Sequence, residues 1–294
     1  MDKSRKNAGK RAYRIELALK YTLFVFLLAV LLFPYLFMLL KSLMDIVDIN
    51  APVVRFFPTH VTLENYAVFG EYAGYFLNSF IVVIVNTIFV PLTSCLVAFP
   101  LARCRFRGSN FMFSLILATS MIPSSVLQVP QYQLFIRLGL NDTLASQFIG
   151  SFFGGSGMQI FLIIQFMRAI PREMDEAAKI DGANQFMIFL LIVLPLCFNV
   201  CVYIGIGVAI AKWNDFQGPL IYLKTDAKRT MAVAFYYHFG SSGDASLLTN
   251  VKMAMATCMT IFPAILFFVF QKQMIGGIKI GSSKGIKLCF KSKN

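Results

Sequence analysis

The sequence YAGYFLNSFIVVIVNTIFVPLTSCLVAFPLA, residues 72–102, contains no Asp, Glu, Lys or Arg. Five other segments of at least 19 residues share this property: 21–40, 111–136, 143–167, 182–211 and 253–271. An α-helix rises about 1.5 Å per residue, so roughly 20 residues cross a hydrocarbon core of about 30 Å. An open sheet would leave backbone groups unpaired in lipid. The six segments therefore predict an all-α, polytopic membrane protein with six transmembrane helices.

The composition agrees with this prediction. Of the 294 residues, 57% are hydrophobic and 14% are charged, whereas soluble domains carry about 25% charge. A soluble protein with six buried helices would have too little polar surface. We expect a transmembrane domain over residues 21–271, an N-terminal arm over 1–20 and a C-terminal tail over 272–294. The expected spans are about 21–40, 76–101, 111–130, 144–167, 187–211 and 252–271.

The distribution of basic residues predicts the orientation. If both ends of the chain lie inside, the inner arm, loops and tail carry 19 of the 27 Lys and Arg residues. This is the bias seen in cytoplasmic loops. Both termini are therefore expected in the cytoplasm, with the loop between spans four and five on the same side. The net charge of +13 is then accounted for by attraction to an anionic inner leaflet, and it does not require nucleic acid.

Several kinds of chemistry lack the residues they need. The two histidines, His60 and His238, lie outside the spans, and Cys197 and Cys201 share a helix face without a third ligand. We therefore expect neither a metal site nor catalytic residues, and the protein is not expected to be an enzyme. No charged residue lies in the middle of a span, which argues against a proton- or sodium-coupled carrier. No phosphate-binding loop is present either.

One inner loop has the pattern of a docking element. Residues 171–182 read PREMDEAAKIDG. Pro171 suits the first turn of a helix, and Glu173 and Asp175 fall where carboxylates favour the positive end of the helix dipole. Gly182 tolerates the left-handed conformation that ends a helix. Small side chains between these ends allow another surface to approach closely, although an ordinary capped loop helix would show the same pattern.

The same loop resembles the EAA motif of ABC importer permeases. The matching positions are Glu176, Ala177, Ala178, Gly182, Ile192, Leu194 and Pro195. In that family, the loop forms coupling helices that sit in a cleft of the ATPase subunit. The resemblance implies a charged contact at Glu176, a turn between two short helices at Gly182 and packing at the two alanines. The implied docking residues are Glu176, Ala177, Ala178, Lys179, Asp181, Gly182 and Ala183.

Other segments resemble the second membrane subunit of the maltose-type carbohydrate permeases. They include Phe57-Pro58, residues 62–66, 121–123, 138–140 and 213–216. The chain departs from that family at its end, because the family usually stops near Lys284-Gly285 and this chain runs on to Asn294. The resemblance implies a bacterial inner-membrane permease that works with a second permease, two ATPase subunits and an extracytoplasmic sugar-binding protein. It implies no cofactor, because the partner subunits bind ATP.

Uncharged polar residues within the spans suit a neutral sugar. Our candidates for the transport pathway are Asn86, Gln128 and Asn199, although such residues also join helices to one another by hydrogen bonds. Two alternatives remain open at this point. The solute could be glycerol phosphate or a polyol instead of a sugar, or the protein could be a secondary carrier.

Overall fold

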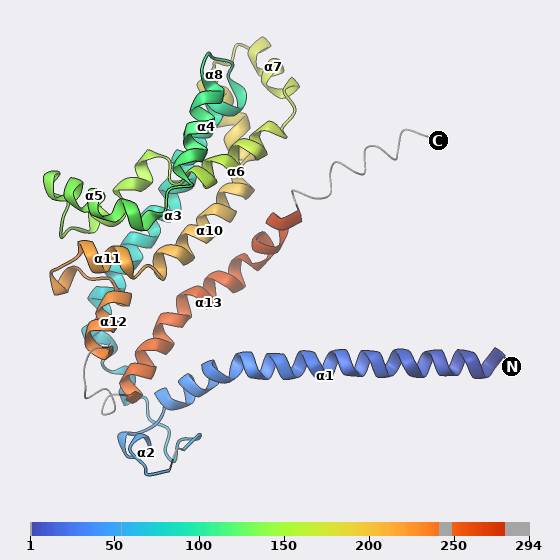
Figure 1. Ribbon diagram of the computed structural model, residues 1–294, viewed down its shortest axis with the longest axis vertical. Helices are drawn as coiled ribbons and strands as arrows, with labels where there is room; N and C mark the ends of the chain where they lie inside the picture. Colours follow the sequence, from blue (N-terminus) through green and yellow to red (C-terminus); the bar gives the residue numbers. More distant parts are fainter. Residues whose placement is uncertain (1, 54, 241–248, 280–294) are drawn as a thin grey trace. The chain divides into compact units, whose positions relative to one another are not determined.

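The computed structural model describes residues 2–53, 55–240 and 249–279 (Figure 1). Within these ranges every regular element is a helix or a helical turn. The all-α class predicted from the sequence is therefore confirmed for the part of the chain that the structure describes. Residues 280–294 of the predicted tail lie outside the described residues.

Four helices are long and apolar enough to cross a membrane, and the number is up to six if each of two bent helix pairs is one span. Three of the predicted spans lie within single long helices. The first, second and sixth fall within α1 (Asp2–Ser42), α3 (Phe69–Arg103) and α13 (Thr249–Lys279). The helix of the first span also continues back through most of the predicted N-terminal arm.

The third span is not the single helix that we predicted over residues 111–130. It consists of α4 (Ser109–Thr119) and α5 (Ser124–Arg137), which are bent by 97°. Pro123 stands at the N-cap of α5. Proline donates no backbone hydrogen bond and disfavours helical geometry in the residue before it. The break therefore follows from a residue that lies inside a charge-free segment.

The fourth span begins with short turns. The predicted range 144–167 contains the 3₁₀ turns η2 (Leu144–Gln147) and η3 (Ile149–Phe153), and the regular helix α6 runs only over Gly157–Arg168. A Cβ atom on Gly157 would lie 2.3 Å from the carbonyl oxygen of Ile116. Glycine is therefore required where α6 packs against α4, because any side chain would clash with the α4 backbone.

The fifth span is bent as well. The segment Gln185–Leu196 and helix α10 (Phe198–Trp213) meet at an angle of 69°. The first part comprises α8 (Gln185–Ile188), the π-helical turn η4 (Phe189–Val193) and α9 (Leu194–Leu196). The predicted span over residues 187–211 therefore contains an interruption that hydrophobicity alone does not reveal.

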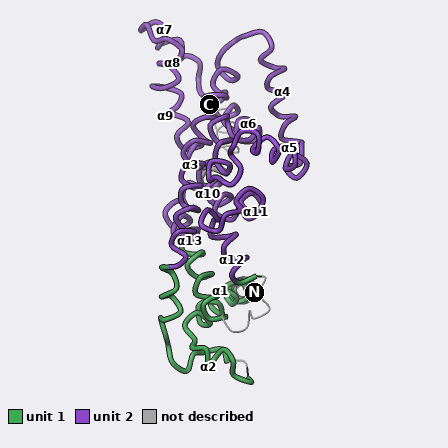
Figure 2. Tube along the Cα trace, turned by 90° about the vertical axis from the view of Figure 1, so that its left-hand side faces the viewer, with its two compact units in different colours: residues 1–70, 239–261 green, residues 71–238, 262–294 purple. Residues whose placement is uncertain are grey.

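The chain divides into two compact units, shown in Figure 2. Unit 1 comprises residues 1–70 and 239–261, with the short helices α2 (Ile46–Ile49) and η1 (Glu64–Tyr66). Within it, the buried amide of Asn65 donates to the carbonyl oxygens of Ser42 and Met44 at 2.9 Å each, and Asn250 donates to Asn65 at 2.8 Å. These bonds tie the end of α1 to the start of α13.

Unit 2 comprises residues 71–238 and 262–294 and contains the main hydrophobic core. The core lies among α3, α6 and the segment from α8 to α10, with fully buried side chains at Cys95, Ile163, Ile164, Val193 and Cys197. The helices α11 (Gln217–Tyr222), η5 (Asp226–Lys228) and α12 (Met231–Phe239) follow α10.

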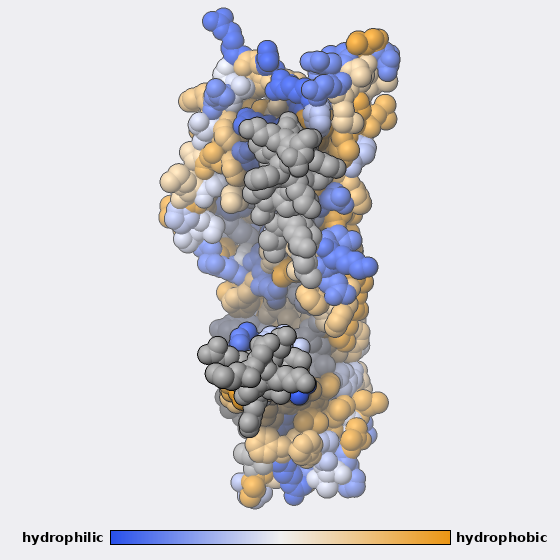
Figure 3. Space-filling model, turned by 90° about the vertical axis from the view of Figure 1, so that its right-hand side faces the viewer, coloured by the Kyte–Doolittle hydropathy of each residue, from blue (hydrophilic) through white to orange (hydrophobic). Residues whose placement is uncertain are grey.

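Much of the apolar surface is not covered by this chain. In the most apolar window of Tyr13–Ser42 no residue is buried, and in that of Phe69–Arg103 39% are. Figure 3 shows hydrophobic side chains spread over one face of the molecule. Such exposure is unfavourable in water and is expected of surfaces that face lipid or other membrane helices.

Candidate functional site: a docking loop and a cavity

The predicted docking loop forms helix α7 (Glu173–Ile180), which Figure 2 shows at one end of unit 2. Its first turn carries Glu173, Asp175 and Glu176, which favour the positive end of the helix dipole. At its other end, the Gly182 N–H donates to the Lys179 carbonyl at 3.0 Å and the Ala183 N–H donates to the Ala178 carbonyl at 2.9 Å. This pair of bonds is a Schellman helix end.

Glycine is needed at position 182 for its backbone conformation. Gly182 has φ +86°, and nothing lies within 4 Å of a Cβ atom built there. Two residues later, the Asn184 side chain accepts a hydrogen bond of 2.8 Å from the Met187 N–H and starts α8. The predicted turn between two short helices is therefore present, and its two ends are fixed by local hydrogen bonds.

A buried arginine holds α7 against the transmembrane helices. Arg103 is the last residue of α3, and its guanidinium donates to the Ile170 carbonyl at 2.8 Å and to the Asp175 carboxylate at 2.9 Å. It also approaches the carbonyls of Met167 and Pro171 at 3.3 Å. The side chain is 2% exposed. The Arg103 guanidinium therefore joins the ends of α3 and α6 to α7. A displacement of α7 would consequently also move both of these helices.

The opposite side of α7 is exposed and partly apolar. Ile180 is 87% exposed, and Phe186 in α8 is 62% exposed. Single exposed apolar residues are common on proteins, but these two lie on adjacent short helices with charged residues near them. Such a surface suits a partner that buries it.

The predicted docking residues divide between this surface and the core. Ala178 and Ala183 are half-buried and pack against the hydrophobic core. The other five are exposed: Glu176, Ala177, Lys179, Asp181 and Gly182. The packing role expected at Ala178 fits its position, whereas Ala177 is free to meet another surface.

The rest of the predicted motif lies at the π-helical turn. Ile192, Leu194 and Pro195 are on or next to η4, where the Leu194 N–H donates to the Phe189 carbonyl. Because proline has no N–H, Pro195 cannot form the regular helical bond to residue 191. π-Helical turns are often found at functional sites. The motif therefore joins a docking helix to an irregular, bent span.

Unit 2 also contains a cavity of about 1480 Å³. It is lined by residues of α3, α5, α6, α10 and α11, and all three predicted pathway residues contribute: Asn86, Gln128 and Asn199. Further amide side chains in the lining are Gln131, Gln147, Gln159, Gln165 and Gln217. Neutral donors and acceptors of this kind suit the hydroxyl groups of an uncharged polar solute.

The three pathway residues differ in their contacts. Asn86 is 3% exposed, and its amide donates to the carbonyls of Val82 at 2.8 Å and Gln147 at 3.2 Å. It therefore joins α3 to η2, as the alternative interpretation of in-span polar residues predicts. Gln128 and Asn199 line the cavity from α5 and α10.

Arg103 and Ile180 are not among the site residues predicted from the sequence. Arg103 directly follows the charge-free segment 72–102, where the sequence indicates an inner basic residue beside the membrane. A cation at the end of a span is usual, and only the fold shows that this one is buried. Ile180 could have been noticed as a large aliphatic residue in an otherwise polar short helix.

These features define a helical protein with several apolar helices long enough to cross a membrane and one exposed short helix, α7, that is held by Arg103. Residues 91–279, more than half of the chain, match the family described as binding-protein-dependent transport system inner membrane component. The chain belongs to this family. It is therefore an inner-membrane component of a transport system, and its family is one of transporters and not of enzymes.

Curated relatives cover nearly the same length. The chain is 31% identical over 274 residues to the arabinooligosaccharides transport system permease protein AraQ of Halalkalibacterium halodurans, covering 89% of this chain and 94% of that protein. It is 29% identical over 257 residues to the melibiose/raffinose/stachyose import permease protein MelC of Bacillus subtilis, covering 86% and 91%.

Solved structures share the fold. One chain of a bacterial ABC transporter involved in the import of the acidic polysaccharide alginate superimposes with a TM-score of 0.79 at 20% identity, covering 89% of this chain and 97% of that one. A second chain comes from a bacterial alginate ABC transporter in complex with an alginate pentasaccharide-bound periplasmic protein. It gives a TM-score of 0.59 at 12% identity and covers 90% and 96%.

Proposed function

We propose that this protein is one of two permease subunits of an ATP-driven, binding-protein-dependent importer of carbohydrate. Family membership supports the transport role and the need for a binding protein. The relatives AraQ and MelC carry the names of oligosaccharide systems. The orientation with both termini in the cytoplasm, expected from the basic residues, puts α7 on the inner side.

The observation that carries this proposal is the geometry of α7. The helix is exposed on one side, ends in the Gly182 turn and is bound by Arg103 to α3 and α6. An ATPase that closes on ATP binding would push or pull this helix, and Arg103 would pass the movement to the spans. Each ligand then biases one shared two-state element, as energetic coupling requires.

The proposed assembly contains four further polypeptides. They are a second, homologous permease, two ATPase subunits and an extracytoplasmic binding protein. The unburied apolar surface of α1 and α3 is consistent with a second permease in the membrane. ATP is bound by the ATPase subunits, and this chain needs no cofactor of its own.

The cavity favours a neutral carbohydrate over glycerol phosphate. The only charged residues in its lining, among those the structure describes, are Lys212 and Asp215, and they pair at 3.4 Å. A phosphate ester is bound most strongly by an unpaired cation, and the described residues of the cavity lining offer none. Amides remain for hydroxyl groups, so a neutral oligosaccharide or polyol is the better fit.

Reconstituted transport tests the energy source. The complex in liposomes should take up sugar only with internal ATP and external binding protein. Uptake driven by an ion gradient without ATP would show instead a secondary carrier. Competition between uncharged and phosphorylated sugars then separates the two solute classes.

Substitutions in the docking loop test the coupling role. Glu176→Lys and Gly182→Pro should lower co-purification of the ATPase about tenfold, because the first reverses a contact charge and the second cannot adopt φ +86°. Arg107→Glu, an exposed reversal on another loop, serves as the control and should leave the yield unchanged. An undiminished yield with both loop variants would contradict the proposal.

A further inference from the structure

Asp142 lies in a strained turn between α5 and η2. It has φ 57°, and it is the sole non-glycine residue with positive φ among those described. Asp and Asn are the side chains that tolerate this conformation best, because their short polar groups bond locally. At Asp142, however, the carboxylate bonds to a segment about 80 residues further along the chain.

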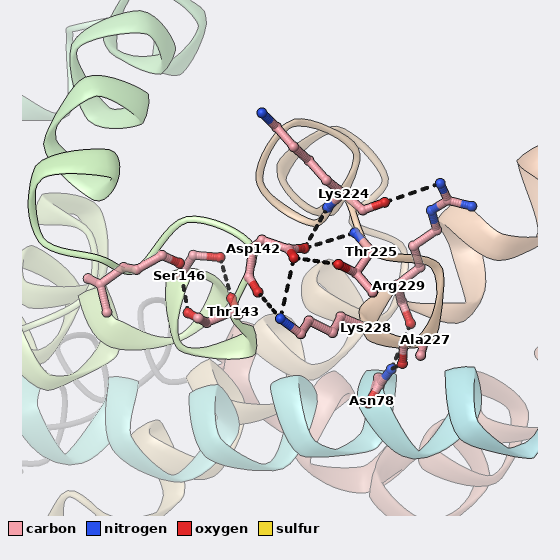
Figure 4. Close-up of polar contacts among 10 residues, drawn as sticks. Asn78, Asp142, Thr143, Ser146, Lys224, Thr225, Ala227, Lys228 and Arg229 are labelled. Carbon is pink, nitrogen blue, oxygen red and sulfur yellow. Dashed lines mark hydrogen bonds and ion pairs between the residues drawn. The ribbon is translucent and has the colours of Figure 1, made fainter.

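Asp142 bonds to Lys224, Thr225 and Lys228, as Figure 4 shows, and also to Tyr222. The carboxylate accepts from the N–H groups of Lys224 at 2.8 Å and Thr225 at 2.9 Å, and from the Thr225 hydroxyl at 2.6 Å. The Lys228 ammonium lies 2.8 Å from the Asp142 carbonyl oxygen and 3.3 Å from its carboxylate. The Asp142 N–H donates to the Tyr222 carbonyl at 2.9 Å.

The same segment is held from its other side by α3. The Asn78 amide donates to the carbonyls of Ala227 and Arg229 at 2.9 Å each, and the Ser79 hydroxyl accepts from the Met231 N–H at 2.8 Å. Residues 224–229 therefore form a loop with little freedom, although most of them are exposed. The hydrogen bonds of Asp142 link this loop to the α5–η2 connection, and we call this set of bonds the Asp142 tie.

The two segments that Asp142 joins both line the cavity. Ser146 and Gln147 follow Asp142 in η2, and Gly218 and Tyr222 precede the loop in α11. The Gln147 and Gly218 positions approach each other, since a Cβ atom on Gly218 would lie 3.2 Å from the Gln147 side-chain oxygen. The Asp142 bonds therefore lie where one end of the cavity is formed by two parts of the chain.

We propose that Asp142 is a positioning residue that makes the α5–η2 connection and the α11–α12 connection move as one body when the cavity opens. This inference rests on the proposed transport function. If the two connections separated, the cavity could open at this end without the movement transmitted from α7. Asp142 would thus keep opening of the cavity coupled to the ATPase cycle.

The chemistry of the carboxylate supports a permanent tie. Hydrogen bonds from the Thr225 hydroxyl and N–H, with those from Lys224 and Lys228, hold the pKa of Asp142 well below its usual value. The Asp142 side chain is 23% exposed, and its partners Lys224, Thr225 and Lys228 are exposed. Bonds to charged groups contribute more than neutral ones.

Four variants distinguish the loss of the Asp142 bonds from a general change of charge in the same region. Asp142→Gly keeps the positive φ and removes the carboxylate, whereas Asp142→Asn keeps the shape and removes the charge. Lys228→Met removes the ammonium that meets Asp142. Arg137→Met is the matched control, because it deletes an equal charge at the exposed last residue of α5, five positions before Asp142. Lys224 is unsuitable, because its side chain points away from Asp142 in Figure 4 but its ammonium lies 5.6 Å from the Tyr132 ring of α5.

Two measurements are made on the assembled complex. Hydrogen exchange of residues 223–230 reports the tie directly, and the ratio of binding-protein-stimulated to basal ATP hydrolysis reports coupling. Asp142→Gly should speed exchange of the Lys224 and Thr225 amides about tenfold and reduce the ratio about fivefold, with smaller effects for Asp142→Asn and Lys228→Met. Arg137→Met should change neither.

Two results would overturn the inference. Unchanged exchange in Asp142→Gly would mean that Asp142 does not hold the loop. Faster exchange with an unchanged hydrolysis ratio would mean that the turn is merely structural. A wild-type complex that fails to respond to binding protein would instead refute the proposed function, and the exchange data would still show whether Asp142 holds the loop.

Discussion

Two charged residues with long-range contacts organise unit 2 at the scale of the single residue. Arg103 joins α3, α6 and α7, and Asp142 joins the connections on either side of the cavity. The Arg103 guanidinium donates to carbonyl oxygens at the end of α6, and the Asp142 carboxylate accepts from two backbone N–H groups of a distant loop. Hydrogen bonds to charged groups contribute more than neutral ones, so each residue helps to fix the segments it joins.

Substitution of Arg103 should destabilise the docking helix. Arg103→Met would leave the Asp175 carboxylate, which is 12% exposed, without its cation and should cost about 2–4 kcal/mol. Arg103→Lys should be intermediate, because an ammonium cannot reproduce the planar fork. Thermal unfolding of the purified complex and ATPase co-purification would measure both effects. Arg105→Met, at an exposed neighbour, should change neither quantity; an equal loss would refute a specific role for Arg103.

The Asp142 tie should be insensitive to pH over the physiological range. Its pKa is lowered from 3.8, so its contribution to stability is fully present above that value and is lost as pH falls through the lower folded value. The difference in melting temperature between wild type and Asp142→Asn should therefore be constant from pH 8 to pH 5 and shrink only in stronger acid. A difference that disappears already near pH 6 would contradict this.

Helix interruptions set the geometry at the scale of the element. The breaks at Pro123 and beside Pro195 turn two charge-free segments into bent pairs. A proline does not by itself interrupt a helix, because α3 continues through Pro91 and Pro100. At Pro195 the missing hydrogen bond coincides with a π-helical turn, and this combination gives a span that can change its bend when α7 moves.

Restoring the missing donor should stiffen the fifth span. Pro195→Ala supplies an N–H that can bond regularly to residue 191, so the 69° bend should decrease and sugar uptake should fall several-fold, with insertion intact. Spin labels at the exposed residues Leu191 and Tyr203 would show the change as a longer distance. Pro34→Ala in α1 is the control. An unchanged distance in Pro195→Ala would show that the bend does not depend on proline.

The whole molecule presents surfaces that this chain does not cover. The α1 helix has no buried residue in its most apolar window, and the docking loop exposes Ile180. Both features agree with the proposed assembly, in which lipid, a second permease and an ATPase would cover different surfaces.

The proposed orientation makes a prediction for the intact cell. In a background without native cysteines, a cysteine at Lys224 should react with an impermeant maleimide from outside, because its loop is exposed. A cysteine at Arg107, also exposed, should react only after permeabilisation. The reverse pattern would overturn the assignment of both termini to the cytoplasm, and with it the position of the docking loop.

The sequence by itself determined the fold class, the approximate location of the spans and the docking loop. Charge-free length and the Gly182 turn are local properties, since lipid excludes charge along any crossing helix and positive φ favours glycine at one residue. The family resemblance also depended on spacing along the chain. These features were predictable because each depends on residues that are close together in the sequence.

The bends, the cavity and the roles of Arg103 and Asp142 follow from the packing of the helices. Hydropathy does not distinguish a straight span from α4 and α5 at 97°, because it reports the composition of a segment and not the direction of its axis. Arg103 resembles any basic residue at a span end until α6 and α7 surround it. Asp142 resembles any turn residue until the 224–228 loop packs against it. Their roles depend on residues about 70 to 80 positions away, and only the packing of the helices brings those residues together.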